Sequence, residues 1–268
     1  MRRGRERVVP LRDAREIALS REAGGLAARV LAMLTPHVQA GVSTDHLDQL
    51  CNDFIVNELR CVPTNVGYGG FPKTICTSLN HVVCHGIPSA QEFLKDGDIL
   101  NVDVAVTTPE GWIGDTSRMY YVGEPSNQAK RLVNTTYEAL LAGIRAVKPG
   151  ATLGDVGHAI ESVAHRERFG VVREYCGHGI GTVYHDEPQV LHYGTPGSGM
   201  RLETGMIFTI EPMLNAGKAA TRELSDGWTV ITNDKSLSAQ WEHMVVVTET
   251  GADVLTRWPE GTGSYPSV

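Results

Sequence analysis

The sequence of 268 residues lacks several features that mark specialised classes of protein. Its five cysteines are odd in number and show no CxxC spacing, so we expect reduced thiols in a cytoplasmic protein. It also lacks an excess of basic residues. The formal net charge is −7, which argues against broad binding to nucleic acids, because that binding usually needs a basic face.

No apolar segment follows the basic N-terminal run "MRRGRER". This run is therefore neither a signal peptide nor a membrane anchor, and we expect a solvated tail over residues 1–11. A weak, transient contact with the ribosome or with RNA is the alternative for this tail. Residues 259–268 are expected to form a second tail. Since 41% of the residues are hydrophobic, the chain between the tails can bury the core of a single domain over residues 12–258.

An internal repeat organises this domain. The segment "VQAGVSTDHLDQL" (38–50) aligns with "VKPGATLGDVGHAI" (147–160), and "DGDILNVDV" (96–104) aligns with "TGMIFTIEP" (204–212), at offsets of about 109 residues. The first pair reads as a helix end, a glycine turn, a Ser or Thr cap and a new helix. Helical patterns precede both copies, and strands with period-2 apolar patterns follow the helices.

The repeat predicts two similar halves, about 12–125 and 126–255, which we call the first half and the second half. The fold class is α+β: in each half, helices cover one face of a mainly antiparallel sheet. The opposite faces of the two sheets would meet at a shared central site.

Acidic residues occupy strand positions where apolar residues are expected. "ILNVDVAVTTPEGWIGDTSRMYYVG" reads as a β-hairpin that places Asp103 and Asp115 six positions either side of Pro109. With the turn centred there, the two carboxylates are cross-strand neighbours with Cβ atoms about 5 Å apart. They would repel each other unless a cation lies between them. Glu211 and Glu242 repeat this pattern in the second half.

His178, between two glycines in "YCGHGIGTVYHDEPQV", adds an imidazole to these four acids. Five ligands exceed the need of one metal ion but suit two ions about 3.5 Å apart. Carboxylates with one imidazole favour Mn, Fe(II), Co or Zn. His185 follows one short loop later, over the expected substrate position, and its neighbours Asp186 and Glu187 predict a protonated imidazole.

Six motifs in this order resemble those of type I methionine aminopeptidases, which have the pita-bread fold: "NHVVCHGIP", "NVDVAV", "GDTSRMYYVG", "VREYCGHGIGTVYHDEPQV", "FTIEPM" and "SLSAQWEHMVVVTETG". The resemblance covers residues 10–258. It implies a single catalytic domain that removes the N-terminal methionine of nascent chains with a small second residue, through a metal-bridging hydroxide. A cytoplasmic monomer without membrane or DNA partners is expected.

The same resemblance implies roles for individual residues. Two divalent ions would be held by five side chains, with Asp115 and Glu242 bridging both ions. We expect Glu211 to be the general base as well as a ligand, and the resemblance implies that His85 and His185 touch the substrate. The full set of implied ligands is Asp103, Asp115, His178, Glu211 and Glu242; the implied methionine pocket is Tyr68, Phe71, Cys76 and Trp228; and a monovalent cation would lie near Asn80, Val82 and Ser238.

The sequence departs from the family pattern beside the methionine pocket. Asn65 stands where many bacterial members have cysteine, and "GYGGF" carries more glycine than is usual. An X-Pro dipeptidase or aminopeptidase of the same fold is one alternative, although such enzymes usually carry an additional N-terminal domain. A non-catalytic binding module on the same scaffold is the other alternative, although all five ligand positions are present here.

Overall fold

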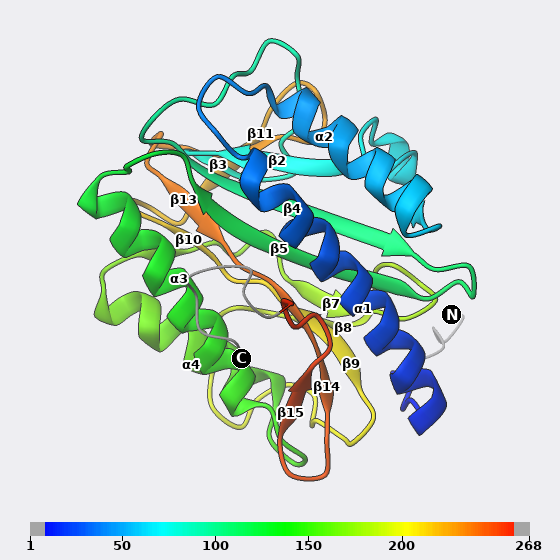
Figure 1. Ribbon diagram of the computed structural model, residues 1–268. Coiled ribbons are helices and arrows are strands. Elements are labelled where there is room, and N and C mark those ends of the chain that lie inside the picture. Colours follow the sequence, from blue (N-terminus) through cyan, green and yellow to red (C-terminus); the bar gives the residue numbers. More distant parts are fainter. Residues whose placement is uncertain (1–8, 260–268) are drawn as a thin grey trace, which may run out of the picture.

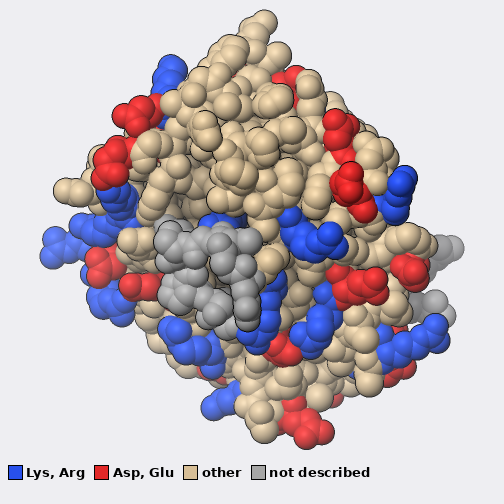
Figure 2. Space-filling model, in the orientation of Figure 1, with Lys and Arg blue, Asp and Glu red and all other residues tan. Residues whose placement is uncertain are grey.

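The structure is a computed structural model that describes residues 9–259, in which helices flank antiparallel sheets (Figure 1). The expected tails, with the ribosome contact proposed for one of them, fall almost wholly on residues 1–8 and 260–268, outside the described residues. No helix within residues 9–259 is long and apolar enough to cross a membrane. On the face shown in Figure 2, Lys and Arg side chains are interspersed with Asp and Glu side chains.

In the first half, helices α1 (Ala14–Leu34) and α2 (Thr44–Asp53) pack on one face of a four-stranded sheet. Strands β1 (Val62–Pro63) and β2 (Ile75–Leu79) pair with one edge of β4 (Ile99–Thr107), and β5 (Ile113–Tyr121) pairs with the other edge. Three short turns of helix complete this half: η1 (Thr35–His37), η2 (Phe54–Glu58) and η3 (Tyr68–Gly70).

In the second half, helices α3 (Asn127–Ala146) and α4 (Leu153–Arg166) cover a five-stranded sheet and a three-stranded sheet (Figure 1). The order in the larger sheet is β15-β14-β9-β7-β8, and in the smaller sheet β13-β10-β6. The larger sheet consists of β7 (Gly177–Gly179), β8 (Asp186–Val190), β9 (Ile207–Ile210), β14 (His243–Val247) and β15 (Ala252–Val254). The smaller sheet consists of β6 (Gly170–Val171), β10 (Met213–Asn215) and β13 (Ser238–Gln240).

A fourth sheet joins segments far apart in the chain. It has the order β11-β12-β3, where β3 (Val82–Cys84) comes from the first half, and β11 (Thr221–Glu223) and β12 (Val230–Thr232) come from the second half. The described strand pairs of all four sheets are antiparallel, as the sequence predicts.

Positions matched by the internal repeat share their backbone conformation. Gly41 and Gly150 have φ of 88° and 82°, and each is followed two residues later by an N-cap whose side chain accepts a backbone N–H of the next helix. Gly97 and Gly205, which precede β4 and β9, both have φ of 92°. Glycine adopts this left-handed conformation without the clash that a Cβ atom would cause. The matched glycines therefore start equivalent elements in both halves.

The inner faces of the two halves meet through β5 and the segment that links β13 to β14. The backbone N–H of Glu242 donates to the carbonyl of Ser117 at 3.3 Å, and the hydroxyl of Thr116 donates to the carbonyl of Glu242 at 2.8 Å. Asn101 on β4 adds a bond from its amide nitrogen to the carbonyl of Gln240 at 2.8 Å. These buried bonds bring Glu242 against β5, where Asp115 lies.

The register of the β4–β5 hairpin differs from the prediction. Asp103 pairs with Ser117, so Asp103 and Asp115 share a face but are diagonal neighbours, not directly opposite residues. The reversal is centred one residue later than expected: the N–H of Gly111 donates to Thr108, and Gly111 has φ of 83°. This five-residue connection, from Thr108 to Trp112, shifts the pairing by two residues.

Candidate active site

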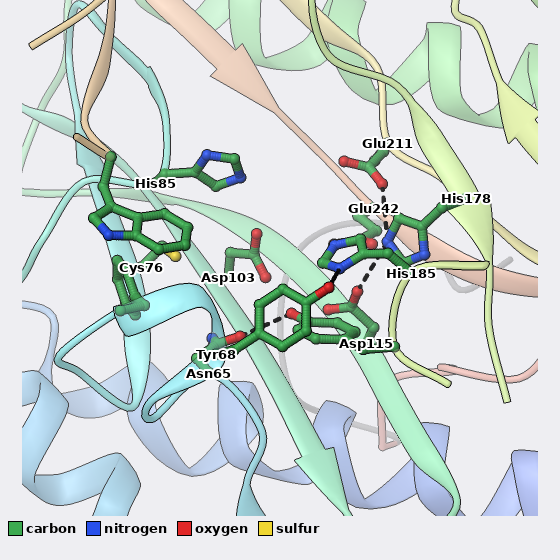
Figure 3. Close-up of a pocket in the computed structure, with 13 residues that line it drawn as sticks. Asn65, Tyr68, Cys76, His85, Asp103, Asp115, His178, His185, Glu211 and Glu242 are labelled. Carbon is green, nitrogen blue, oxygen red and sulfur yellow. Dashed lines mark hydrogen bonds and ion pairs between the residues drawn. The ribbon is translucent and has the colours of Figure 1, made fainter. Parts of the chain in front are cut away.

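The cavity between the two halves gathers every ligand and pocket residue that the sequence indicated for a metallopeptidase (Figure 3). It encloses about 560 Å³ when its open mouth is included. Its lining consists of Asn65, Tyr68, Phe71, Cys76, His85, Asp103, Asp115, His178, Tyr184, His185, Glu211, Trp228 and Glu242. Two of these, Tyr184 and Asn65, are not among the ligand, substrate or pocket residues that the sequence indicates.

Four carboxyl groups meet in this cavity from four segments. Asp103 lies on β4, Asp115 on β5, Glu211 just after β9, and Glu242 just before β14. Burial raises the pKa of Asp115 to about 7, and burial and then mutual repulsion raise the pKa of the other three well above their usual range. One carboxylate oxygen each of Asp103 and Asp115 has no hydrogen-bond partner among residues 9–259. The acids are therefore short of positive charge, which a metal ion would supply.

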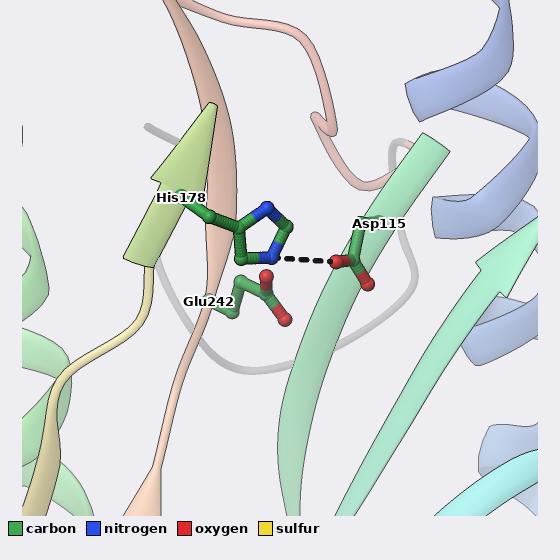
Figure 4. A group of neighbouring side chains, drawn as sticks. All are labelled: Asp115, His178 and Glu242. Atoms are coloured by element: carbon green, nitrogen blue, oxygen red, sulfur yellow. Dashed lines mark ion pairs between the residues drawn. The ribbon is translucent and has the colours of Figure 1, made fainter. Parts of the chain in front are cut away.

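His178 on β7 presents its imidazole to these acids (Figure 4). Its Nε2 atom lies 3.5 Å from Asp115 Oδ2 and 3.6 Å from Glu211 Oε1. Its Nδ1 lies 3.1 Å from the carbonyl oxygen of Gly179, which accepts the Nδ1 hydrogen and leaves the Nε2 lone pair facing the carboxylates. Burial lowers the pKa of His178 to about 4, so the ring is neutral, as a metal ligand must be. Donor atoms of Asp115, His178 and Glu242 lie within 4.8 Å of one another.

Glu211 is held by three polar neighbours. The hydroxyl of Thr209 donates to Oε1 at 2.9 Å, and the amide of Gln240 donates to Oε2 at 3.2 Å. The backbone N–H of Glu211 donates to Nε2 of His192 at 3.2 Å. No pattern in the sequence marks His192 as a site residue. Its ring is fully buried, and it lies in a loop that carries no motif, so only the folded chain reveals the contact.

The two other histidines that the sequence indicated, His85 and His185, also line the cavity. His85 has a positive φ of 57°, and its ring centroid lies 6.1 Å from that of Trp228. The Nδ1 atom of His185 lies 2.7 Å from the hydroxyl of Tyr68, across the mouth of the cavity. Loss of solvation lowers the pKa of both imidazoles to about 4, with a smaller contribution from His185 at His85 and from His178 at His185.

The prediction of a protonated His185 is therefore wrong. The acids next to it in sequence, Asp186 and Glu187, are not what determines its charge. The ring instead packs on aromatic and imidazole rings, 4.2 Å from that of Tyr184 and 4.3 Å from that of His178. Loss of solvation in this environment favours the neutral form.

An aromatic pocket lies beside the acids, and its four predicted residues all line the cavity. Phe71 and Trp228 meet edge to face with centroids 5.1 Å apart, and Cys76 is 7% exposed. Burial raises the pKa of the Cys76 thiol well above its usual range, so it remains protonated and apolar in character. Tyr184 completes the wall, and its hydroxyl donates to Asn65 Oδ1 at 2.8 Å.

The fold and the sequence match known proteins over nearly the whole chain. The pattern described as Metallopeptidase family M24 matches residues 18–249. The methionine aminopeptidase of Haemophilus influenzae is 52% identical over 249 residues, 92% of each chain, and that of Escherichia coli K12 is 52% identical over 248 residues, 92% of this chain and 94% of the relative.

A solved structure supports the same assignment. The methionine aminopeptidase from Rickettsia prowazekii superposes with a TM-score of 0.91 at 50% identity, covering 93% of this chain and 100% of the other. This likeness confirms the predicted pita-bread fold. The chain therefore belongs to metallopeptidase family M24 and, within that family, to the methionine aminopeptidases.

Proposed function

We propose that the protein removes the N-terminal methionine from peptides whose second residue is small, as on nascent chains in the cytoplasm, and that it acts as a monomer. Membership of family M24 makes it a metal-dependent peptidase. The observation that carries the proposal is one cavity in which four carboxyl groups and a neutral imidazole border an aromatic pocket. The preference for a small second residue rests on the family resemblance.

The five side chains fit a pair of divalent ions. Asp103 and Asp115 each keep a buried carboxylate oxygen without a partner among the described residues, and oxygen ligands with one imidazole suit Mn, Fe(II), Co or Zn. We infer that two ions would be held by Asp103, Asp115, His178, Glu211 and Glu242. When bound, such a pair would supply a hydroxide nucleophile at neutral pH and polarise the scissile carbonyl.

Glu211 acts as the general base in the proposed hydrolysis. It takes the proton of the attacking water and later passes it to the leaving amine. Thr209 and Gln240 fix both of its carboxylate oxygens, so the carboxylate is oriented before the substrate arrives. Its backbone N–H is tied to His192, which places the residue where β9 ends.

His85 and His185 bind and polarise the substrate as neutral hydrogen-bond donors. If the hydroxyl of Tyr68 donates to Nδ1 of His185, the hydrogen of that imidazole resides on Nε2. An Nε2–H facing the scissile carbonyl stabilises the negative charge that develops on its oxygen. His185 therefore needs no positive charge for this role.

Tyr68, Phe71, Cys76 and Trp228 form the pocket for the methionine side chain in this proposal. A flexible thioether makes favourable contacts with aromatic edges and sulfur. By the same resemblance, a monovalent cation lies near Asn80, Val82 and Ser238. Asn80 has φ of 53°, and its carbonyl accepts the N–H of Ser238 at 2.7 Å, which brings backbone groups of this set together.

Peptide assays on the metal-loaded protein test the function. Met-Ala-Ser should be cleaved to free methionine, while Ala-Pro peptides should be cleaved far more slowly. Faster cleavage of the Ala-Pro peptides would identify an X-Pro peptidase of the same fold. Metal analysis of the same sample should give two equivalents per chain, and a chain that binds no divalent metal and cleaves neither peptide would be a binding module.

A further inference from the structure

The wall of the proposed methionine pocket carries a buried polar pair. Asn65 is 6% exposed, and its Oδ1 accepts the hydroxyl hydrogen of Tyr184 at 2.8 Å. Its amide nitrogen donates to the carbonyl oxygen of Thr74 at 3.1 Å. Both Asn65 and Tyr184 line the same cavity as Phe71, Cys76 and Trp228 (Figure 3). A pocket for a thioether alone would not need a carboxamide in its wall.

These two bonds fix the direction of the carboxamide. Because the carbonyl of Thr74 can only accept, the nitrogen must face Thr74, and Oδ1 then faces the hydroxyl of Tyr184 (Figure 3). A carboxamide has two N–H groups, and one of them serves the carbonyl of Thr74. Among residues 9–259 no acceptor is bonded to the second N–H of Asn65. Asn65 therefore keeps one N–H without a partner among the described residues, on a side chain that lines the cavity.

The hydroxyl and thiol groups of the pocket wall do not duplicate this donor. The hydroxyl of Tyr68 is engaged with His185, and the thiol of Cys76 is only a weak donor. The hydroxyl hydrogen of Tyr184 is used by Asn65. The remaining N–H donors of the lining are the indole of Trp228 and the imidazoles, so a variant at Asn65 is needed to isolate its share.

Methionine itself cannot use that donor well, because a thioether sulfur is a weak acceptor. Oxidation of methionine adds one oxygen to the sulfur and gives a polar sulfoxide with an otherwise similar chain. We propose that the pocket also binds N-terminal methionine sulfoxide, with the sulfoxide oxygen accepting the free N–H of Asn65. The enzyme would then release oxidised as well as intact methionine. This inference rests on the function proposed above.

The chemistry of the pocket limits the ligands of Asn65 to side chains that carry an uncharged acceptor oxygen. Asn65 offers a dipole and no charge, so a carboxylate side chain would be buried without a counterion. It would also lie in the same cavity as Asp103, Asp115, Glu211 and Glu242. A sulfoxide brings one strong acceptor and no net charge, and so it matches the single N–H.

The test compares three peptides, Met-Ala-Ser, its sulfoxide and norleucine-Ala-Ser, on metal-loaded protein. Norleucine lacks both sulfur and oxygen and reports the apolar part of binding. The test variant is Asn65→Leu combined with Tyr184→Phe, because replacing both partners with apolar groups of similar shape avoids an orphaned hydroxyl. The matched control is Tyr184→Phe alone, which keeps the carboxamide. Asn65→Cys is a second test variant in case the double variant does not fold.

We expect the ratio of kcat/KM for the sulfoxide to kcat/KM for norleucine to fall about tenfold or more in the test variants, which corresponds to about 1.4 kcal/mol for one unpaired buried acceptor. In Tyr184→Phe the ratio should stay within about threefold of the wild-type ratio, because the donor remains.

A ratio that is unchanged in both test variants would overturn the inference, as would a wild type that cleaves Met-Ala-Ser but not the sulfoxide. A wild type that cleaves neither Met-Ala-Ser nor norleucine-Ala-Ser would instead refute the proposed function, and this inference with it.

Discussion

Removal of metal should make the stability of this protein fall as the pH rises above neutrality. Burial raises the pKa of Asp103, Glu211 and Glu242 well above their usual range in the absence of bound cations. The folded metal-free chain then retains protons that the unfolded chain has lost. A raised carboxyl pKa stabilises the fold at low pH, and that stabilisation is lost as the pH rises toward the folded-state pKa.

Each retained proton changes the free energy of unfolding by about 1.4 kcal/mol per pH unit. Other groups also titrate, however. Loss of solvation lowers the pKa of six histidines, which makes the unfolded chain the better proton binder below neutrality and opposes the effect of the acids: His81, His85, His178, His185, His192 and His243. The acid contribution must therefore be measured as a difference between two proteins that share these histidines.

Glu242→Gln provides that comparison, because it removes one retained proton and leaves the histidines in place. Over the pH range in which Glu242 keeps its proton in the fold but loses it in the unfolded chain, metal-free wild type should lose up to about 1.4 kcal/mol per pH unit more than metal-free Glu242→Gln. This corresponds to a difference of about 3–6 °C in the change of Tm for a chain of this size. Thermal unfolding after chelation, at constant ionic strength, measures it. Parallel pH profiles for the two proteins would refute the reasoning that these acids are buried with their protons.

Two substitutions address the catalytic assignments. Glu211→Gln should lower kcat by a factor of about 10² or more with little change in KM, because the amide cannot accept the proton of water; near wild-type kcat with metal bound would contradict the role. His185→Ala should lower kcat and kcat/KM together by about 10² to 10³ with metal content intact, because the lost N–H acts mainly in the transition state. Loss of a metal ion in that variant would make His185 a ligand, and a rise in KM alone would limit it to substrate binding.

Helix starts that are marked by local signals were predicted correctly from the sequence. The Ser43 and Thr152 caps each follow a glycine with positive φ, and helices begin at Thr44 and Leu153, next to them. These signals act over a few residues, so the sequence contains them completely. The hairpin was also recognised, but its register depends on the conformation of Gly111 and on whether Trp112 joins the turn. Apolar alternation cannot resolve a shift of two residues, because it leaves every side chain on the same face.

Contacts between segments far apart in the chain could not be predicted from the sequence. His192 accepts a hydrogen bond from Glu211, which lies 19 residues away in the sequence. Tyr184 donates a hydrogen bond to Asn65, which lies 119 residues away. No spacing or motif encodes such pairs, and only the packing of the sheets brings them together. The charge of His185 was mispredicted for the same reason, since the prediction used its neighbours in sequence, whereas the ring packs against His178 and Tyr184.

Metal binding is linked to the contact between the two halves, because each half contributes ligands to the same cavity. The first half contributes Asp103 and Asp115, and the second half contributes Glu211, Glu242 and His178. Bringing the two sets together buries four acids that repel one another, so it is opposed by electrostatics unless protons or cations enter. The bonds from Thr116 to Glu242 and from Asn101 to Gln240 hold the halves in contact at the same place. A cation bound there stabilises only the docked arrangement, and its binding energy therefore also strengthens the contact between the halves.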